Sequence, residues 1–170
     1  MNFRFAELVE TKEFQYVRIH KNANRSVMNC ILDTYKDNIE YTFGLSKKPR
    51  FCIIRDPYER FLSGLKYDLL INNVDIKDID IKKVFTSNEN HIRNTLNGTI
   101  NHSISQIPYL MNYQIEHYID IDDLNLFLKM HFNQTKHLNA FPEEHKTSKY
   151  YDIEKYLDKK ALSLDAILIT

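Results

Sequence analysis

Apolar residues in the first third of the chain change from the spacing of a strand to the spacing of a helix, and they do so twice. Residues 14–19 (FQYVRI) are rich in aromatic and β-branched side chains, which predicts a strand. Three-four spacing then predicts a helix from about Arg25 or Ser26, with apolar positions Val27, Cys30, Ile31 and Tyr35. Residues 50–54 (RFCII) predict a second strand covered on both faces.

A second predicted helix follows this strand and has two different faces. Asp56 and Pro57 are a typical N-cap and first-turn pair. The apolar face carries Tyr58, Phe61, Leu62, Leu65 and Leu69. Asp56, Arg60, Ser63 and Tyr67 fall on the other side at four-three-four spacing. Since a helix buries its apolar face, we expect the polar face to be available to a ligand.

The last third of the chain continues the alternation of strands and helices. Residues 115–121 predict a strand, and we expect Asp122 to cap a helix with Leu124, Phe127, Leu128 and Phe132 inward. A short strand at 135–138, a helix capped by Asp152 and a buried strand at 166–169 complete the pattern.

The alternation predicts an α/β fold. We expect one domain over residues 1–170, a three-layer αβα sandwich with a mainly parallel central sheet. Residues 68–101 fit this pattern least, because they are rich in Asn and Asp and their apolar spacing is interrupted. We therefore expect helical pieces there, in a lid or insertion.

Composition narrows the function classes. The 170 residues include 23 basic and 23 acidic side chains, so the net charge is zero and binding to nucleic acid or an acidic membrane through global charge is not expected. No apolar run has the length of a membrane span, and the start lacks the pattern of a signal peptide. We therefore expect a cytoplasmic protein, bacterial or viral in a host cytoplasm. Cys30 and Cys52 are isolated in apolar surroundings, which favours buried thiols over a metal site.

A lysine, a hydroxyl group and a helix start come together after the first predicted strand, in the segment HKNANRS at 20–26. Ligands bind beyond the carboxyl ends of parallel strands, and free helix N–H groups with Lys21 and Ser26 would suit phosphate or sulfate. Asn24 is expected to replace a glycine there, because Asn tolerates the left-handed conformation. The alternative is that Lys21 and Arg25 are solvated loop charges and Ser26 is only an N-cap. A Walker A pattern is absent.

Arg55 follows the second predicted strand, and Ser63 comes eight residues later. Right-handed βαβ connections place successive strand ends on one rim, so Arg55 is expected to meet a second phosphate of a ligand held at Lys21. The alternative is an exposed Asp56–Arg60 pair at i,i+4 spacing, which contributes only about 0.3–0.5 kcal/mol.

Together the two segments resemble the sulfotransferases that use 3′-phosphoadenosine 5′-phosphosulfate (PAPS), in particular the carbohydrate sulfotransferase branch. HKNANRS is similar to the 5′-phosphosulfate loop, and RDPYERFLSG to the 3′-phosphate motif. Residues 102–106 (HSISQ) resemble a His-x-x-x-Gln element, 122–124 an acidic-Leu helix start, and 138–139 a later strand end near the nucleotide. The chain departs from the family at Asn24, where Gly is common, and at Arg25, where Thr or Ser is usual.

The resemblance implies a P-loop-NTPase-like fold and transfer of a sulfuryl group from PAPS to a hydroxyl acceptor, expected to be a saccharide, without a metal. It assigns Lys21 to the bridging oxygen, and the Arg55 and Ser63 side chains to the 3′-phosphate, with Arg60 as a supporting cation. The loop residues assigned to the 5′-phosphosulfate are Lys21, Asn22, Ala23, Asn24, Arg25 and Ser26.

The general base is expected to be His102, with His20, His91 and Glu40 as the other candidates. Neutral charge disfavours a highly sulfated glycosaminoglycan as the acceptor, since that ligand needs a long basic groove. Two other functions stay open at this point: a non-catalytic nucleotide-binding protein derived from a sulfotransferase, and a P-loop-like nucleotide kinase. Turnover with an acceptor separates the first from an enzyme, and magnesium-dependent triphosphate binding would favour the second.

Overall fold

A computed structural model describes residues 7–75, 102 and 106–134 of the chain. The chain divides into two compact units. Unit 1 comprises residues 1–55 and 106–140, and unit 2 comprises residues 56–105 and 141–170. The elements predicted at 135–138, after Asp152 and at 166–169 lie outside the described residues, as does most of the expected lid.

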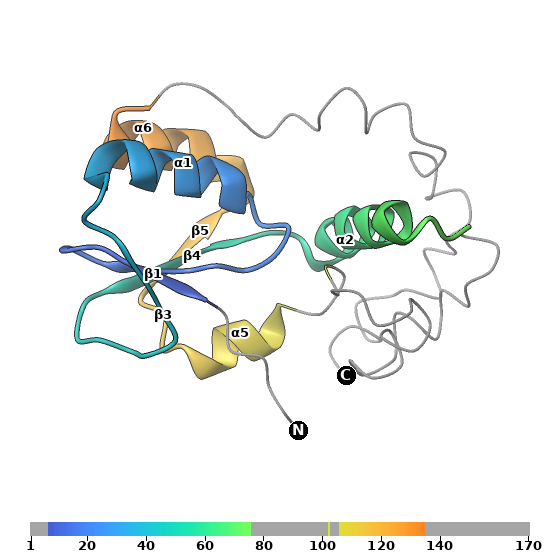
Figure 1. Cartoon of the computed structure of the whole chain (residues 1–170), viewed down its shortest axis with the longest axis horizontal. Helices are drawn as coiled ribbons and strands as arrows, with labels where there is room; N and C mark the ends of the chain where they lie inside the picture. The colour runs from blue at the N-terminus through green and yellow to red at the C-terminus, as the bar shows by residue number, and fades with distance from the viewer. Residues whose placement is uncertain (1–6, 76–101, 103–105, 135–170) are drawn as a thin grey trace. The chain divides into compact units, whose positions relative to one another are not determined.

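Unit 1 is built on a five-stranded mixed sheet of order β3-β1-β2-β4-β5 (Figure 1). Its strands are β1 (Leu8–Glu10), β2 (Gln15–Val17), β3 (Glu40–Thr42), β4 (Arg50–Ile54) and β5 (His117–Asp120). β2, β4 and β5 are parallel, whereas β1 is antiparallel to β2 and to β3. The expectation of a mainly parallel sheet is therefore wrong at this edge. The four residues between β1 and β2 permit a hairpin, while a parallel crossover needs a dozen or more.

The described helices of unit 1 are α1 (Asn24–Tyr35), α5 (Ile107–Asn112) and α6 (Leu124–Phe132), with a 3₁₀ turn, η2 (Ile121–Asp123), before α6. The strands predicted at 14–19 and 115–121 are confirmed in shorter form, and the strand at 50–54 in full. Asp122 does not cap α6 as expected. Instead the Asp120 side chain accepts the Asp122 N–H at 3.0 Å, and this cap starts the 3₁₀ turn one turn earlier.

Successive side chains of a strand point to opposite faces of the sheet, so the buried apolar residues form two clusters, one on each face. On one face, residues such as Tyr16, Phe51 and Ile53 pack with α1 and α6. On the other face, Val17 and Cys52 pack with residues in and just after α5. Figure 1 shows the same division, with α1 and α6 over one side of the sheet and α5 beside the other. Both faces of β2 and β4 are thus covered, as the apolar sequence of β4 predicts, whereas the edge strand β5 is largely exposed.

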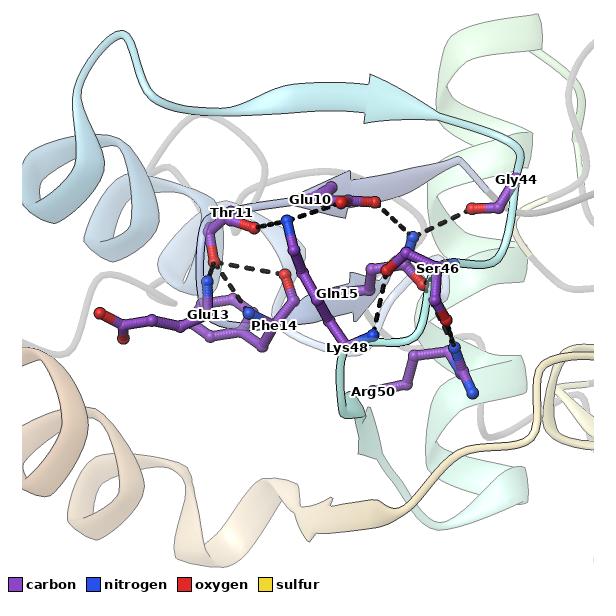
Figure 2. Close-up of polar contacts among 9 residues, drawn as sticks. All are labelled: Glu10, Thr11, Glu13, Phe14, Gln15, Gly44, Ser46, Lys48 and Arg50. Carbon is purple, nitrogen blue, oxygen red and sulfur yellow. Dashed lines mark hydrogen bonds and ion pairs between the residues drawn. The ribbon is translucent and has the colours of Figure 1, made fainter.

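A polar network attaches the connection between β3 and β4 to the end of β1 and the start of β2 (Figure 2). Lys48 Nζ donates to Glu10 Oε1 at 2.7 Å and to the Thr11 carbonyl at 2.6 Å. Gln15 Nε2 donates to Glu10 Oε2 and to the Gly44 carbonyl, and its Oε1 accepts the Ser46 N–H. This network orders the segment that leads into β4.

Unit 2 contributes the described helix α2 (Pro57–Asn72). Asp56 accepts the Glu59 N–H at 2.9 Å, which confirms the predicted N-cap. Phe61, Leu62, Leu65 and Leu69 are buried as expected. The helix continues through residues 68–72, so the expected insertion begins with helical structure that belongs to α2.

The expectation of an accessible polar face on α2 is wrong at Arg60, whose residue is only 2% exposed. The same burial rules out an exposed Asp56–Arg60 pair. No helix among the described residues has the length and apolar character needed to cross a membrane.

Candidate functional site

The segment between β2 and α1 turns sharply at two non-glycine residues. Lys21 and Ala23 have positive φ angles of 65° and 58°, whereas Asn22 between them does not. The expectation that Asn24 takes the left-handed conformation is therefore wrong, because Ala23 occupies the N-cap and Asn24 is the first helical residue. Asn24 has a different role: its Oδ1 accepts the hydroxyl of the fully buried Tyr16 at 2.5 Å.

This backbone geometry suits an anion. Ala23, left-handed and directly before the helical Asn24, turns neighbouring N–H groups toward one side, and an alanine N-cap has no side-chain oxygen to accept from the first turn of α1. The Asn22 N–H is not among these groups, because it donates to the Ile19 carbonyl at 3.2 Å. Around this turn, His20 and Arg25 are exposed, and Lys21 and Asn24 are half-buried. Ser26 is buried within the first turn of the helix, so it is not the N-cap.

Two buried amides join this loop to the end of β4. Asn22 Nδ2 donates to the Ile53 carbonyl at 2.7 Å and to Gln106 Oε1 at 3.0 Å. Gln106 Nε2 in turn donates to the Arg55 carbonyl at 2.8 Å. Asn22 is fully buried, so its side chain holds the loop in place. The contacts fix the backbones of Lys21 and Arg55 at the carboxyl ends of neighbouring parallel strands.

The remaining predicted nucleotide ligands belong to unit 2. Ser63 is half-buried on α2, one turn after the buried Arg60. Arg55 is the last residue of unit 1 before this segment, and its own side chain is half-buried.

A carboxylate–histidine pair in unit 2 was not expected from the sequence. Asp68 is fully buried on α2, and its Oδ1 lies 2.7 Å from His102 Nδ1. The same carboxylate accepts the backbone N–H of His102 at 2.9 and 3.2 Å. The ring of Tyr67 meets the imidazole edge-on, with 4.6 Å between the ring centroids.

This geometry favours one tautomer of the imidazole. A carboxylate at Nδ1 favours a proton on that nitrogen, which leaves Nε2 as an acceptor suited to general-base chemistry. One sequence signal for Asp68 exists: it lies between Leu65 and Leu69 in the apolar stripe of α2, where a carboxylate needs a polar partner.

The other candidate bases lie in unit 1 or outside the described residues. Glu40 pairs in register with Glu10, which pairs with Gln15 at the start of β2, so it lies at the end of the sheet opposite to the Lys21 loop. His20 is exposed within that loop. His91 lies outside the described residues.

Comparison with known proteins finds no matching family model, no matching curated protein and no matching solved structure.

Proposed function

We propose that this protein is a sulfotransferase that transfers a sulfuryl group from PAPS to a hydroxyl group, with a saccharide as the acceptor. The main support is the loop at 20–26, whose left-handed N-cap residue suits an anion and which Asn22 and Gln106 tie to the backbone of Arg55. The proposal includes the finer fold, a three-layer αβα sandwich of the P-loop-NTPase type. The mixed sheet covered by helices on both faces is compatible with it.

PAPS carries a phosphosulfate at the 5′ position of its ribose and a phosphate at the 3′ position. The proposed ligands of these anionic groups are hydrogen-bond donors or positively charged side chains. N–H groups at the start of α1 and Ser26 bind the 5′-phosphosulfate, with Asn22 acting from behind as a positioning residue, since its own N–H donates to the Ile19 carbonyl. Arg55 and Ser63 bind the 3′-phosphate. Arg60 is buried on α2 and acts as a supporting cation rather than as a direct ligand.

The reaction breaks the bond between sulfur and the bridging phosphate oxygen and forms a bond between sulfur and the acceptor oxygen. Negative charge grows on the bridging oxygen as the bisphosphate leaves, and Lys21 stabilises that charge. The acceptor hydroxyl loses its proton to His102 Nε2, while Asp68 stabilises the resulting imidazolium through Nδ1.

The test is thermal unfolding with adenosine 3′,5′-bisphosphate (PAP), the product nucleotide. A ligand at 100 times its dissociation constant adds about 2.7 kcal/mol of stability, so PAP should raise the unfolding temperature clearly. Magnesium ATP is the comparison ligand, and Lys47→Ala, an exposed change outside the loop, is the control variant.

Each outcome decides between functions. A larger shift with magnesium ATP than with PAP favours a nucleotide kinase, and the absence of a PAP shift contradicts the proposal. Where PAP binds, release of PAP from PAPS in the presence of a saccharide panel distinguishes an enzyme from a non-catalytic nucleotide-binding protein.

A further inference from the structure

A cavity of about 270 Å³ lies in unit 1, away from the loop at 20–26. Arg50 and His117 line it, and these are the first residues of β4 and β5. The 20–26 loop and Arg55 instead follow the last residues of the parallel strands. The cavity is therefore at the opposite end of the sheet from the proposed nucleotide site.

Five of the eleven residues that line the cavity are Phe or Tyr. Phe14, Tyr35, Phe51, Phe127 and Phe132 line it. Phe14 meets the rings of Tyr35 and Phe132 edge-on, with centroids 5.6 and 6.2 Å away. Aromatic faces carry negative charge density and attract cations, most strongly where water is excluded.

Formal and partial negative charges lie at the same cavity. The Glu13 carboxylate lines it and accepts the Tyr35 hydroxyl at 2.6 Å. This hydrogen bond lowers the pKa of Glu13, so the carboxylate stays ionised. Tyr35 and Phe132 are also the last residues of α1 and α6, and helix C-termini carry partial negative charge.

The neighbouring positively charged side chains either have other hydrogen-bond partners or are exposed to solvent. The Arg50 guanidinium is bound by Glu116 and by the Ser46 and Gln114 carbonyls, and alternation along β4 puts its side chain on the face opposite to Phe51. Lys12 Nζ lies 3.6 Å from Glu13 Oε1, but the two side chains are 72% and 58% exposed. An exposed pair of this kind is weak, so a ligand can compete with it. Two imidazoles, His117 and His131, complete the polar lining.

We propose that this cavity binds a small organic cation, an ammonium or quaternary ammonium group attached to an apolar or aromatic body. The aromatic walls would contact the cation and its body, and Glu13 would provide the counter-charge. An apolar cavity of about 150 Å³ holds benzene, so this one has room for a ring with a small cationic group. The proposal is independent of sulfuryl transfer.

The experiment is a calorimetric titration of the full chain with three probes of similar shape: benzyltrimethylammonium, benzyl alcohol and benzoate. We expect the cation to bind about ten times more tightly than the neutral alcohol, and benzoate to bind most weakly. Glu13→Gln, which keeps an oxygen for the Tyr35 hydroxyl, should weaken the cation about three- to five-fold and leave benzyl alcohol unchanged.

Two further variants sharpen the test. Lys12→Met removes the competing ammonium and should tighten cation binding about two-fold. Glu40→Gln changes an exposed carboxylate on β3 that does not line the cavity, and it should leave all three affinities as they are.

Chemical-shift mapping of the wild-type chain gives a result that depends on no variant. The cation should shift the ring resonances of Phe14, Tyr35 and Phe127. Equal affinities for the three probes, or shifts centred elsewhere, would overturn the proposal. Because the titrations contain no nucleotide, their outcome is separate from that of the PAP experiment.

Discussion

At the scale of single residues, the first prediction concerns the strained backbone at Ala23. A left-handed conformation costs a residue with a Cβ roughly 1–2 kcal/mol, and Ala23 adopts it at φ 58°. Ala23→Gly removes that repulsion but gives the unfolded chain about 0.4–1 kcal/mol more entropy to lose. We expect the free energy of unfolding to rise by about 0.5–1 kcal/mol, measured by urea denaturation. Asp33→Gly, at an exposed helical position in α1, should not raise it and should lower it by at most about 0.3 kcal/mol, because Asp is itself a poor helix former.

Arg55 carries the second prediction, which rests on the proposed function. Charge-assisted hydrogen bonds are worth about 1.5–3 kcal/mol each, so Arg55→Ala should weaken PAP binding by roughly one to two powers of ten. Adenosine 5′-phosphosulfate lacks the 3′-phosphate and should bind the variant and the wild type nearly equally. The Gln106 contact is to the Arg55 carbonyl and survives the substitution. Equal losses for the two nucleotides would mean that Arg55 supports only the fold.

The Asp68–His102 pair carries the third prediction. His102→Ala should lower kcat on the order of 10² or more while PAP affinity stays the same, because proton removal acts in the transition state. Asp68→Asn should also lower kcat. Nitrogen NMR of the His102 ring in this variant should show a mixture of tautomers in place of a single one. Asp33→Asn on α1 is the matched control. An intact tautomer together with normal kcat in the Asp68 variant would show that this carboxylate only anchors the backbone of His102.

At the scale of elements, the connection between β3 and β4 makes a prediction about pH. The Lys48 hydrogen bond holds the pKa of Glu10 below its ordinary value of 4.5 (Figure 2). A carboxylate with a lowered folded-state pKa adds stability above about pH 4.5, and this stability is lost as the pH falls through the folded-state value. Lys48→Met should therefore cost about 1–2 kcal/mol at pH 7.

The difference in unfolding free energy between wild type and Lys48→Met should then shrink as the pH falls below about 4.5. Chemical denaturation across that range measures it. Lys47→Met, at the exposed neighbouring position, should show little loss at any pH. A difference that stays constant with pH would contradict the Glu10–Lys48 assignment, because a packing role for Lys48 does not titrate.

Which elements the sequence predicts depends on their length and on the range of their contacts. α1, α2, β4 and α6 are long or apolar enough for periodicity to identify them. β1 and β3 have three residues each, which is too short for a pattern, and their antiparallel pairing changes the sheet from mainly parallel to mixed. Expected and observed starts of α1 differ because Ala23 replaces a recognisable cap.

In the candidate site, too, the sequence reveals the local features but not the long-range contacts. Lys21, Ser26 and Arg55 follow strand ends, and this local signal is visible in the sequence. The contact between Asn22 and Gln106 spans 84 positions, so no local pattern reveals it. The pairing of Asp68 with His102 spans 34 positions and joins a helix to a residue outside any described element. Tertiary partners of buried polar groups are therefore the part that sequence reasoning missed.

At the scale of the whole molecule, the two cysteines report how often unit 1 opens. Cys30 on α1 and Cys52 on β4 are both buried, one in each apolar cluster of the sheet. Burial raises the pKa of the Cys30 thiol and raises that of Cys52 to about 12. Because the thiolate is the reactive form, neither cysteine should react with a disulfide reagent at pH 8 until unit 1 opens.

Nucleotide binding to the folded 20–26 loop should slow that reaction further. Where opening of unit 1 also destroys the loop, PAP at 100 times its dissociation constant should slow labelling about 100-fold, since a ligand stabilises only the state that binds it. Magnesium ATP should have a much smaller effect. A Lys47→Cys variant places an exposed thiol in the same unit and should react fast with or without PAP, which controls for effects on the reagent itself. Rapid labelling of both native cysteines would contradict their burial, whereas slow labelling that PAP leaves unchanged would show that PAP does not stabilise the closed form of unit 1.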